Sequence, residues 1–270
     1  MKTIAKSDFQ GFVDDLIKND PREVVGVKSK GSKFVFDKLN SADELRLDYD
    51  VTILPPKKYF LPPRETILRF KKSPYKISVE PVVEVEPKII IGIHPYDLIA
   101  IEQMDKIFSD TYEDTNYLAK REKCFLIGVN IEKVSEWSFA GSMGTATTKS
   151  GYDLMLTHLN GKYTIEVGSS EGSEFIEKLP TKNASSEEVA RVKEKKEKID
   201  EKFEKKLEFL VEELPTILDE NYDNMEFWEK NSEKCFSCAS CNLVCPTCYC
   251  FDLEELSHLD MSEGARKRRW

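Results

Sequence analysis

The sequence predicts an α+β protein, with an N-terminal mixed α/β domain and a small cysteine-rich domain at the other end. Strand-like and helix-like patterns alternate over residues 77–131, which favours a mixed or parallel sheet with covering helices. A charged helical pattern begins near residue 185. Six of the seven cysteines then fall between residues 235 and 250, and such crowding is more typical of metal ligation than of disulfide bonds.

The elements expected in the N-terminal domain follow from hydrophobic periodicity and from the positions of proline and glycine. In chain order they are a helix over residues 7–17 with Ser7 as its cap, strands over 23–27 and 33–36, a proline-fixed connector over 54–63 leading to the segment 66–70, a β-rich stretch over 77–85, a strand over 89–93, a helix over 95–108, a strand over 124–131, and a hairpin of 152–159 with 163–167. Asn160 and Gly161 join the two hairpin strands, and this dipeptide suits a type I′ turn.

A long, highly charged helix is expected after residue 185. Ser185 and Glu188 have the spacing of a capping box. Apolar residues recur at steps of three or four from Val189 to Leu214, so one face packs on a neighbouring element or binds a partner. Pro215 is expected to end or kink this helix. The predicted domains are 1–180, an N-terminal α/β domain, then 181–231, a charged helical connector, and then the cysteine-rich residues 232–270.

The composition excludes some classes of partner. The formal net charge is -9 and the isoelectric point is near 5.2, which argues against nucleic acid, because phosphate binding needs a basic face. The basic residues 266–269 are the one exception, and they are interpreted as a solvated chain end. No stretch approaches the ~18 apolar residues of a membrane span, and the first residues lack the apolar core of a signal peptide. We therefore expect a cytoplasmic protein with no membrane partner.

The cysteine-rich segment carries the most specific motif. Cys235, Cys238, Cys241 and Cys245, with Pro246 after the last, have the CxxCxxCxxxCP spacing of bacterial-type ferredoxins. Two-residue gaps let three thiolates reach the corners of one [4Fe–4S] cube, while the fourth points toward another cluster. A structural zinc site and a group of inert thiols are the rival interpretations, but zinc normally takes two separated pairs of ligands and the sequence has no distant pair. We expect a 4Fe-4S cluster held by these four cysteines.

Two questions stay open at this stage. Cys248 and Cys250 follow at a spacing that geometry does not assign, so each is either a surrogate ligand or a buried thiol near the cluster. A two-cluster fold needs a second CxxCxxCxxxCP motif, and these 270 residues contain none. Either the chain is a fragment of a longer polypeptide that holds two clusters, or it holds one cluster with Cys245, Cys248 or Cys250 as fourth ligand. The first reading is favoured, so residues 232–270 are interpreted as the first half of a helical ferredoxin-like 4Fe-4S dicluster domain.

The sequence resembles the beta, electron-transfer subunit of cytosolic nickel–iron sulfhydrogenases and the related A subunit of anaerobic sulfite reductase. The resemblance covers nearly the whole chain. Its most specific parts are residues 235–251 with the ending CPTCYCF, FLPPRE at 60–65, SMGT at 142–145, GYDL at 151–154, EVGS at 166–169 and the tail RKRRW at 266–270. It implies a subunit that relays electrons by [4Fe–4S] clusters between a flavin- and nicotinamide-binding subunit and the subunits that carry the terminal chemistry. Cys235, Cys238 and Cys241 match ligands of one cluster, and Cys245 matches a ligand of the other.

The chain also departs from this family. Members typically carry further cysteines in the N-terminal domain, and the matching positions here are Tyr96, Ile131, Ser138 and Ala140. Because four thiolates complete one cube, losing all four together is what the loss of an entire cluster would look like. We therefore expect no N-terminal cluster.

The remaining candidates have simpler interpretations. His94 follows an apolar strand and is read as a loop histidine in preference to a ligand, and His158 and His258 have no evident partner. Cys124 begins an apolar strand and is read as a core residue. The glycine-rich loop 141–148 could cradle an anion with its amides, but it lacks the lysine spacing of a phosphate-binding loop and the GxGxxG pattern.

The sequence thus predicts an iron–sulfur electron-transfer subunit of an anaerobic cytoplasmic oxidoreductase complex, of the hydrogenase or sulfite reductase type. Its partners are the other subunits of that complex, including one that binds flavin and NAD(P). No catalytic residue is assigned, and a non-catalytic subunit is favoured over a stand-alone enzyme. Two alternatives stay open: a docking or scaffold subunit whose N-terminal domain has lost its cluster, and a flavin- or substrate-binding oxidoreductase domain in its own right.

Overall fold

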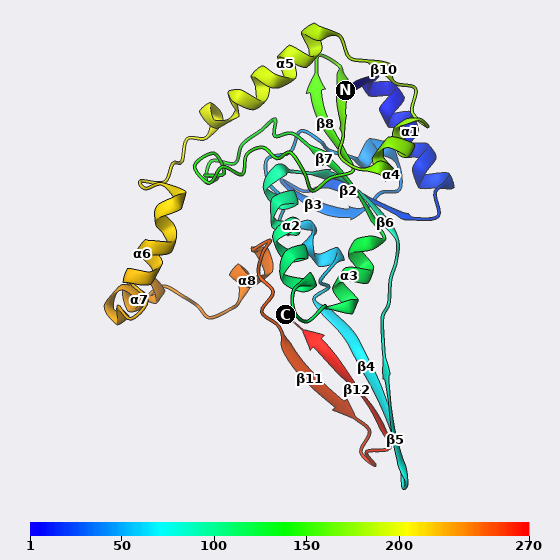
Figure 1. The fold of residues 1–270 in the computed structure, drawn as a ribbon, viewed down its shortest axis with the longest axis vertical. Coiled ribbons are helices and arrows are strands. Elements are labelled where there is room, and N and C mark those ends of the chain that lie inside the picture. Colours follow the sequence, from blue (N-terminus) through cyan, green and yellow to red (C-terminus); the bar gives the residue numbers. More distant parts are fainter. Residues whose placement is uncertain (270) are drawn as a thin grey trace.

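The structure, a computed structural model, describes residues 1–269. Figure 1 shows a body built on one large sheet and a narrow arm built on a second sheet. The elements of the body are β1 (Lys2–Ala5), α1 (Lys6–Asn19), β2 (Glu23–Lys30), β3 (Lys33–Lys38), the 3-10 helices η1 (Ala42–Glu44) and η2 (Pro56–Tyr59), β6 (Lys88–Ile93), α2 (Pro95–Ser109), α3 (Thr115–Glu122), β7 (Cys124–Val129), β8 (Leu154–Leu159), β9 (Lys162–Val167), α4 (Ser170–Ile176) and β10 (Lys182–Asn183).

Eight strands form the sheet of the body, in the order β10-β1-β9-β8-β7-β6-β2-β3. The four strands β2, β6, β7 and β8 run parallel to one another, and the remaining pairs are antiparallel. The expected mixed sheet is therefore confirmed. Strands β6 and β7 are buried at every position, and each fully buried isoleucine or leucine there stabilises the fold by roughly 1.5–3 kcal/mol.

Helices cover both faces of this sheet. Phe175 of α4 stacks on Phe125 of β7, with ring centroids 4.3 Å apart, and meets Phe12 of α1 edge-on at 5.4 Å. Gly128, three residues along β7, faces the other way, because a Cβ there would lie 2.9 Å from Leu98 of α2. Helices α1 and α4 thus pack on one face of the sheet and α2 packs on the other, as alternating strand side chains require.

Local predictions were accurate at the turn and less so at the first helix. Asn160 and Gly161 both have positive φ, 43° and 81°, so the predicted type I′ hairpin between β8 and β9 is confirmed. Helix α1, in contrast, begins at Lys6 directly after β1, and Ser7 does not cap it. The backbone N–H of Lys6 donates instead to the carbonyl oxygen of Gly161 at 3.1 Å, because the adjoining sheet supplies the acceptor.

The arm is a four-stranded antiparallel sheet in the order β11-β12-β4-β5 (Figure 1). Its strands are β4 (Arg64–Ser73), β5 (Lys76–Pro81), β11 (Asp252–Ser257) and β12 (Glu263–Arg269). The α+β class is confirmed, but the helical structure expected after residue 250 is wrong, since residues 252–269 form strands and His258 lies between them. Pairing with β4, far away in the sequence, decides this local conformation.

The connector also differs from its prediction. It contains α5 (Ser186–Glu197), the 3-10 helices η3 (Ile199–Lys202) and η4 (Val211–Glu213), α6 (Leu214–Glu220) and α7 (Met225–Ser232). The capping box of Ser185 and Glu188 is confirmed, but the single long helix to Leu214 is wrong, because α5 stops at Glu197. Pro215 lies in the first turn of α6 rather than at a helix end, a position where its missing N–H costs nothing.

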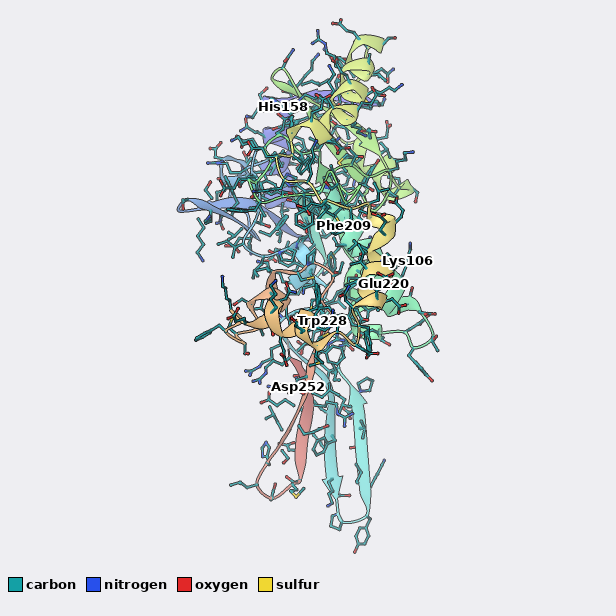
Figure 2. The ribbon with its side chains drawn as sticks, turned by 90° about the vertical axis from the view of Figure 1, so that its left-hand side faces the viewer. Lys106, His158, Phe209, Glu220, Trp228 and Asp252 are labelled. Carbon is teal, nitrogen blue, oxygen red and sulfur yellow. The ribbon has the colours of Figure 1, made fainter. Side chains whose placement is uncertain are left out.

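Burial along the connector is limited to the middle of the predicted apolar stripe. Val192, Ile199 and Phe203 are buried, whereas Val189 before them and Leu210 after them are 41% and 68% exposed. Figure 2 shows Phe209, Glu220 and Trp228 along the connector beyond that point. In the part of the chain that the structure describes, no helix has the length and apolar character needed to cross a membrane. The domain division at residues 180 and 231 stays a prediction.

Candidate metal centre

The four motif cysteines lie on one segment between α7 and β11. Cys235 and Cys238 are in the loop, Cys241 lies in the short helix α8 (Ser240–Val244), and Cys245 caps the end of that helix. Cys235, Cys238 and Cys241 are exposed and Cys245 is half-buried. The segment therefore offers its thiols at the surface of the molecule.

Backbone conformation bends this loop. Ser237 and Ala239, which flank Cys238, have φ of 54° and 59°, a left-handed conformation that is uncommon for residues with a side chain and marks a tight turn. The backbone N–H of Ser237 donates to the Sγ of Cys235 at 3.4 Å. Such N–H groups directed at sulfur are one of the means by which proteins tune iron–sulfur sites.

The thiols are free and two of them are activated. All six cysteines of the segment are unpaired thiols rather than disulfides. The Sγ of Cys238 is hydrogen-bonded to the Oγ of Ser240 at 3.3 Å, and this contact lowers the pKa of Cys238. Burial raises the pKa of Cys245, but a hydrogen bond with Thr247 at 3.4 Å, backbone N–H groups and the charge of Lys57 outweigh it, so its pKa lies below the usual value. Thiolates are the form that binds metal.

The sulfur atoms do not converge on one centre in the structure. Over residues 1–269, no three His, Cys, Asp or Glu side chains are grouped closely enough to hold a metal ion. The ligand roles of Cys235, Cys238, Cys241 and Cys245 therefore stay predictions. So do the surrogate roles of Cys248, which is half-buried, and of Cys250, which is exposed. The chemistry of the donor set fits an iron–sulfur cluster, because the thiols are free, lie on one bent loop and include two with lowered pKa values.

A buried lysine attaches the cysteine segment to the body. Lys57, on η2, is 3% exposed, and its Nζ donates to the carbonyl oxygens of Cys248 at 2.9 Å and of Asn242 at 3.1 Å. Burial lowers the pKa of Lys57, while Cys248 and Cys245 raise it. No sequence pattern predicts this contact, because a lysine after two prolines belongs to no periodicity that would indicate its burial.

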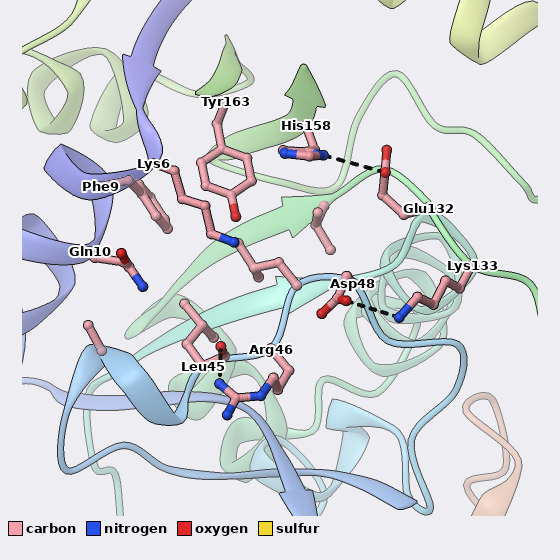
Figure 3. Close-up of a pocket in the computed structure, with 13 residues that line it drawn as sticks. Lys6, Phe9, Gln10, Leu45, Arg46, Asp48, Glu132, Lys133, His158 and Tyr163 are labelled. Carbon is pink, nitrogen blue, oxygen red and sulfur yellow. Dashed lines mark hydrogen bonds and ion pairs between the residues drawn. The ribbon is translucent and has the colours of Figure 1, made fainter. Parts of the chain in front are cut away.

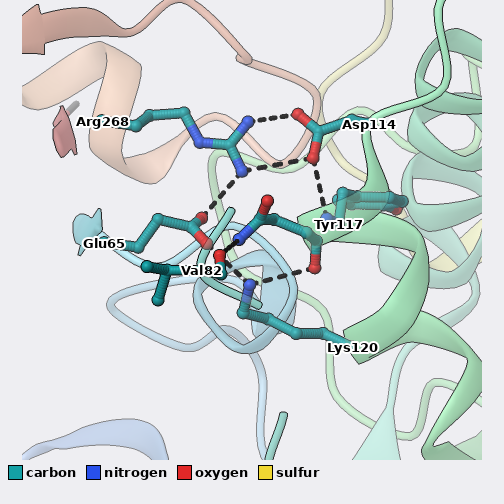
Figure 4. A network of polar contacts seen from close by, with 7 residues as sticks. Glu65, Val82, Asp114, Tyr117, Lys120 and Arg268 are labelled. Carbon is teal, nitrogen blue, oxygen red and sulfur yellow. Dashed lines mark hydrogen bonds and ion pairs between the residues drawn. The ribbon is translucent and has the colours of Figure 1, made fainter. Parts of the chain in front are cut away.

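A second buried cation attaches the end of the chain (Figure 4). Arg268 on β12 is 2% exposed, and its guanidinium donates to Glu65 at 2.7 Å and to Asp114. Lys120 donates to the other oxygen of Glu65 at 2.7 Å. The guanidinium also lies over the ring of Phe251, 5.0 Å from its centroid. The expectation of a solvated basic tail is therefore wrong for Arg268, because strand pairing turns this residue toward two carboxylates.

The histidines lie away from the cysteines. His94 is fully buried at the start of α2, stacks on Tyr49 at 4.0 Å and has its Nδ1 2.7 Å from the hydroxyl of Tyr96. Burial lowers the pKa of His94 to about 3, so the ring is neutral. His158 and His258 each face a carboxylate, with Nδ1 3.5 Å from Glu132 and Nε2 3.4 Å from Glu263, partners that the sequence did not reveal.

The four positions that the resemblance matches to further cysteines lie near one another. Tyr96, Ser138 and Ala140 line a cavity of about 440 Å³ that also reaches Pro246 of the cysteine motif. Ile131 and Ala140 belong to a small apolar cluster against which Tyr96 packs. The expectation that this region holds no cluster stays a prediction. Cys124 is buried in β7, as expected of a core residue.

The glycine-rich loop 141–148 is not arranged as an anion cradle. The amides of residues 143, 144 and 145 donate to carbonyl oxygens of the same loop region at 3.2, 3.1 and 2.9 Å. The Oγ of Ser142 accepts from the backbone N–H of Leu207 at 3.1 Å, so the connector covers this side of the loop. Because these three amides already donate to carbonyl oxygens, they do not form a cradle for a phosphate.

Comparison with known proteins assigns the family. The family model for a 4Fe-4S dicluster domain matches residues 234–270. Sulfhydrogenase 2 subunit beta of Pyrococcus furiosus is 33% identical over 252 residues, which span 92% of this chain and 72% of that protein. The chain belongs to the sulfhydrogenase beta-subunit family. No solved structure matches it.

Membership of the sulfhydrogenase beta-subunit family confirms the predicted resemblance and the 4Fe-4S cofactor. The prediction of an iron–sulfur subunit for electron transfer is also confirmed, without the identity of its partners. The dicluster match covers Cys235, Cys238, Cys241 and Cys245 together with two strands of the arm, β11 and β12. The iron–sulfur domain of this sulfhydrogenase-type subunit therefore includes a sheet that it shares with β4 and β5.

Proposed function

We propose that this subunit relays electrons between a flavin- and NAD(P)-binding subunit and a terminal catalytic subunit, within an anaerobic cytoplasmic complex of the hydrogenase or sulfite reductase type. The observation that carries the proposal is the bent loop of free, mostly exposed thiols whose following residues are fixed to the body by Lys57. Exposed ligands favour exchange of electrons with another protein, because electron transfer weakens as the distance grows. The subunit itself needs no catalytic residue.

The proposed ligand roles follow the motif. Cys235, Cys238 and Cys241 hold one [4Fe–4S] cluster, and Cys245 is a ligand of a second cluster or the fourth ligand of the first. The bound cluster supplies one-electron redox chemistry. Around it, the N–H of Ser237 donates to Cys235, and Lys57 places a positive charge beside Cys245 and Cys248. Both features favour extra negative charge on the sulfur atoms, so both stabilise the reduced form.

The proposed division of labour follows the predicted domains. Residues 1–180 form the α/β domain that positions the cysteine segment through η2. Residues 181–231 connect it to the iron–sulfur domain of residues 232–270. The last two helices of the connector, α6 and α7, have no buried residue, which leaves their surfaces open to partner subunits.

The test is the metal content and spectrum of the full chain purified without oxygen. We expect a brown protein with iron, labile sulfide and, after reduction, the electron paramagnetic resonance signal of a [4Fe–4S]⁺ cluster. Cys238→Ser should lower iron and sulfide and change that signal, whereas the matched control Cys124→Ala, at the buried cysteine of β7, should keep both. A colourless protein with stoichiometric zinc and no sulfide would contradict the proposal.

One observation favours the docking alternative as a second function. Trp137 and Phe139 are 69% and 44% exposed beside the cavity that contains Tyr96 and Ser138, and large exposed apolar groups often mark protein contacts. Deleting the C-terminal residues would damage the fold, because β12 pairs with β4.

The docking alternative is therefore tested in the full chain, with Cys235, Cys238 and Cys241 replaced by serine. If this variant still binds its partner subunits but transfers no electrons, the docking function is supported. Flavin absorbance in the purified protein would instead support a flavin-binding oxidoreductase domain.

A further inference from the structure

A large cavity with no assigned function lies in the body. It has a volume of about 670 Å³, within the 300–1,000 Å³ usual for small-molecule sites. Figure 3 shows it between the start of α1, the loop after η1 and the ends of β7 and β8. In Figure 2, His158 of this pocket lies near one end of the long axis, far from Asp252 at the arm. Open α/β sheets typically bind ligands outside the carboxyl ends of their parallel strands, which is where β7 and β8 end here.

The carboxylates of the pocket already have cationic partners. Asp48 is paired with Lys133 at 2.9 Å, and this contact lowers the pKa of Asp48. Glu132 is paired with Lys195 at 2.7 Å and also faces His158 at 3.5 Å. Lys133 and Lys195 therefore neutralise the two carboxylates. Neither carboxylate is free to bind a cation in the pocket.

Cations of the pocket, in contrast, lack carboxylate partners. The ammonium of Lys6 makes no hydrogen bond or ion pair with any described residue, and acts on Asp48 only at longer range. One nitrogen of the Arg46 guanidinium donates to the carbonyl oxygens of Asp43 at 2.6 Å and Leu45 at 3.0 Å. Its other N–H groups have no acceptor within the described chain. The pocket thus carries an excess of unneutralised positive charge.

A tyrosine hydroxyl points into the same space. Tyr163 is 6% exposed as a residue, and its ring packs edge-on against Phe9 at 5.3 Å. Its hydroxyl has no hydrogen-bond partner among residues 1–269, so it can donate to a molecule in the pocket. Figure 3 shows this hydroxyl and the ammonium of Lys6 directed into the pocket. Phe9, Leu47 and Val129, all buried, supply an apolar wall.

We propose that this pocket binds a small organic anion, a carboxylate or phosphate monoester with an apolar body. Its anionic oxygens accept from Lys6 and Tyr163, with Arg46 at the rim, and its apolar part contacts Phe9 and Leu47. An anion fits because the free groups are two cations and a hydroxyl donor, whereas both acids are already paired. The site is independent of the electron-transfer proposal.

The test is calorimetric titration of the full, cluster-containing chain with three probes of the same shape: benzoate, phenyl phosphate and the uncharged benzyl alcohol. We expect benzyl alcohol to bind at least about tenfold more weakly than the better anion, because it lacks the charge-assisted hydrogen bonds. Whichever anion binds more tightly identifies the head group. Lys6→Met should weaken that anion about tenfold or more, and Tyr163→Phe about threefold or more.

Two further variants make the result specific. Lys18→Met removes an exposed lysine at the other end of the same helix and should leave affinity unchanged. Lys6→Arg keeps the charge and should retain most of the affinity, with iron content and thermal unfolding checked for each variant. The proposal is overturned if neither anion binds, if benzyl alcohol binds as tightly as both anions, or if Lys6→Met binds the anion as well as Lys18→Met does.

Discussion

The Nζ of Lys57 lies 2.9 Å from the carbonyl oxygen of Cys248, which joins a 3-10 helix of the α/β domain to the cysteine segment 191 residues later in the chain. The lysine is almost completely buried, and it also holds the carbonyl oxygen of Asn242. Its positive charge therefore lies beside the last cysteine of the motif, Cys245. This single side chain both fixes the segment and sets part of its electrostatic environment.

Lys57→Met should make the cluster harder to reduce. Removing a positive charge beside the thiolates destabilises the more negative, reduced form, and the expected change in midpoint potential is on the order of 50 mV toward more negative values. A redox titration followed by electron paramagnetic resonance measures it. Lys58→Met is the matched control, because Lys58 lies on the same helix but donates to Phe36 instead. Equal potentials in the two variants would exclude this role of Lys57.

Arg268→Met should destabilise the arm strongly. It removes the partner of two carboxylates, of which Glu65 is 9% and Asp114 19% exposed, and breaking such a buried pair from one side costs about 3–5 kcal/mol. Chemical denaturation of the anaerobic protein gives the free energy of unfolding. Arg266→Met on the same strand removes a surface ion pair with Glu255 and should cost less than about 1 kcal/mol. A loss of similar size in both would mean that the network of Arg268 adds nothing.

Gly161→Ala should destabilise the β8–β9 hairpin. Gly161 has φ of 81°, which an alanine adopts only with strain, so the free energy of unfolding should fall by about 1 kcal/mol or more. Gly11→Ala in the middle of α1 is the opposite case, because no atom lies within 4 Å of the added Cβ, and alanine should stabilise the helix by about 1 kcal/mol. Thermal unfolding compares the two variants. Similar changes of the same sign in both would refute the strained-turn argument.

Asp97→Asn should gain stability relative to the unchanged protein as the pH rises. Burial raises the pKa of Asp97 to about 7 from 3.8. Between those values the folded state binds the proton that the unfolded state has lost, so the unchanged protein loses stability as the pH rises from about 4 to about 7. Above pH 7 the loss is constant, at roughly 4 kcal/mol.

The Asp97→Asn prediction is checked by denaturation at pH 5 and pH 8. The advantage of the variant should be larger at pH 8, because asparagine has no proton to lose. Asp110→Asn, which removes an exposed carboxylate at the end of the same helix, is the matched control. The free energy of unfolding of Asp97→Asn could instead differ from that of the unchanged protein by the same amount at both pH values. That result would rule out ionisation of Asp97 as the cause of the difference.

The predicted secondary structure succeeded where neighbouring residues decide the conformation. The Asn160-Gly161 turn, the Ser185 and Glu188 capping box and the apolar strand β6 all depend on residues a few positions apart. The iron–sulfur motif belongs with them, because its specificity lies in short spacings between cysteines. The prediction of one long connector helix was wrong: α5 ends at Glu197, although burial of the apolar stripe continues to Phe203 and decreases only after it.

By itself, the sequence predicted helices α1 and α2 and strands β2, β3 and β6 to β9 of the body, the 4Fe-4S motif and the family of this chain. Only the tertiary structure decided that Arg268 is buried against Glu65, 203 residues earlier, that Lys57 holds the cysteine segment, and that Lys6, Arg46 and Tyr163 share a pocket. The physical reason is the range of the interactions. Turns and caps are set by hydrogen bonds within a few residues, whereas the burial of a charge depends on which distant carboxylate or carbonyl group the fold brings beside it.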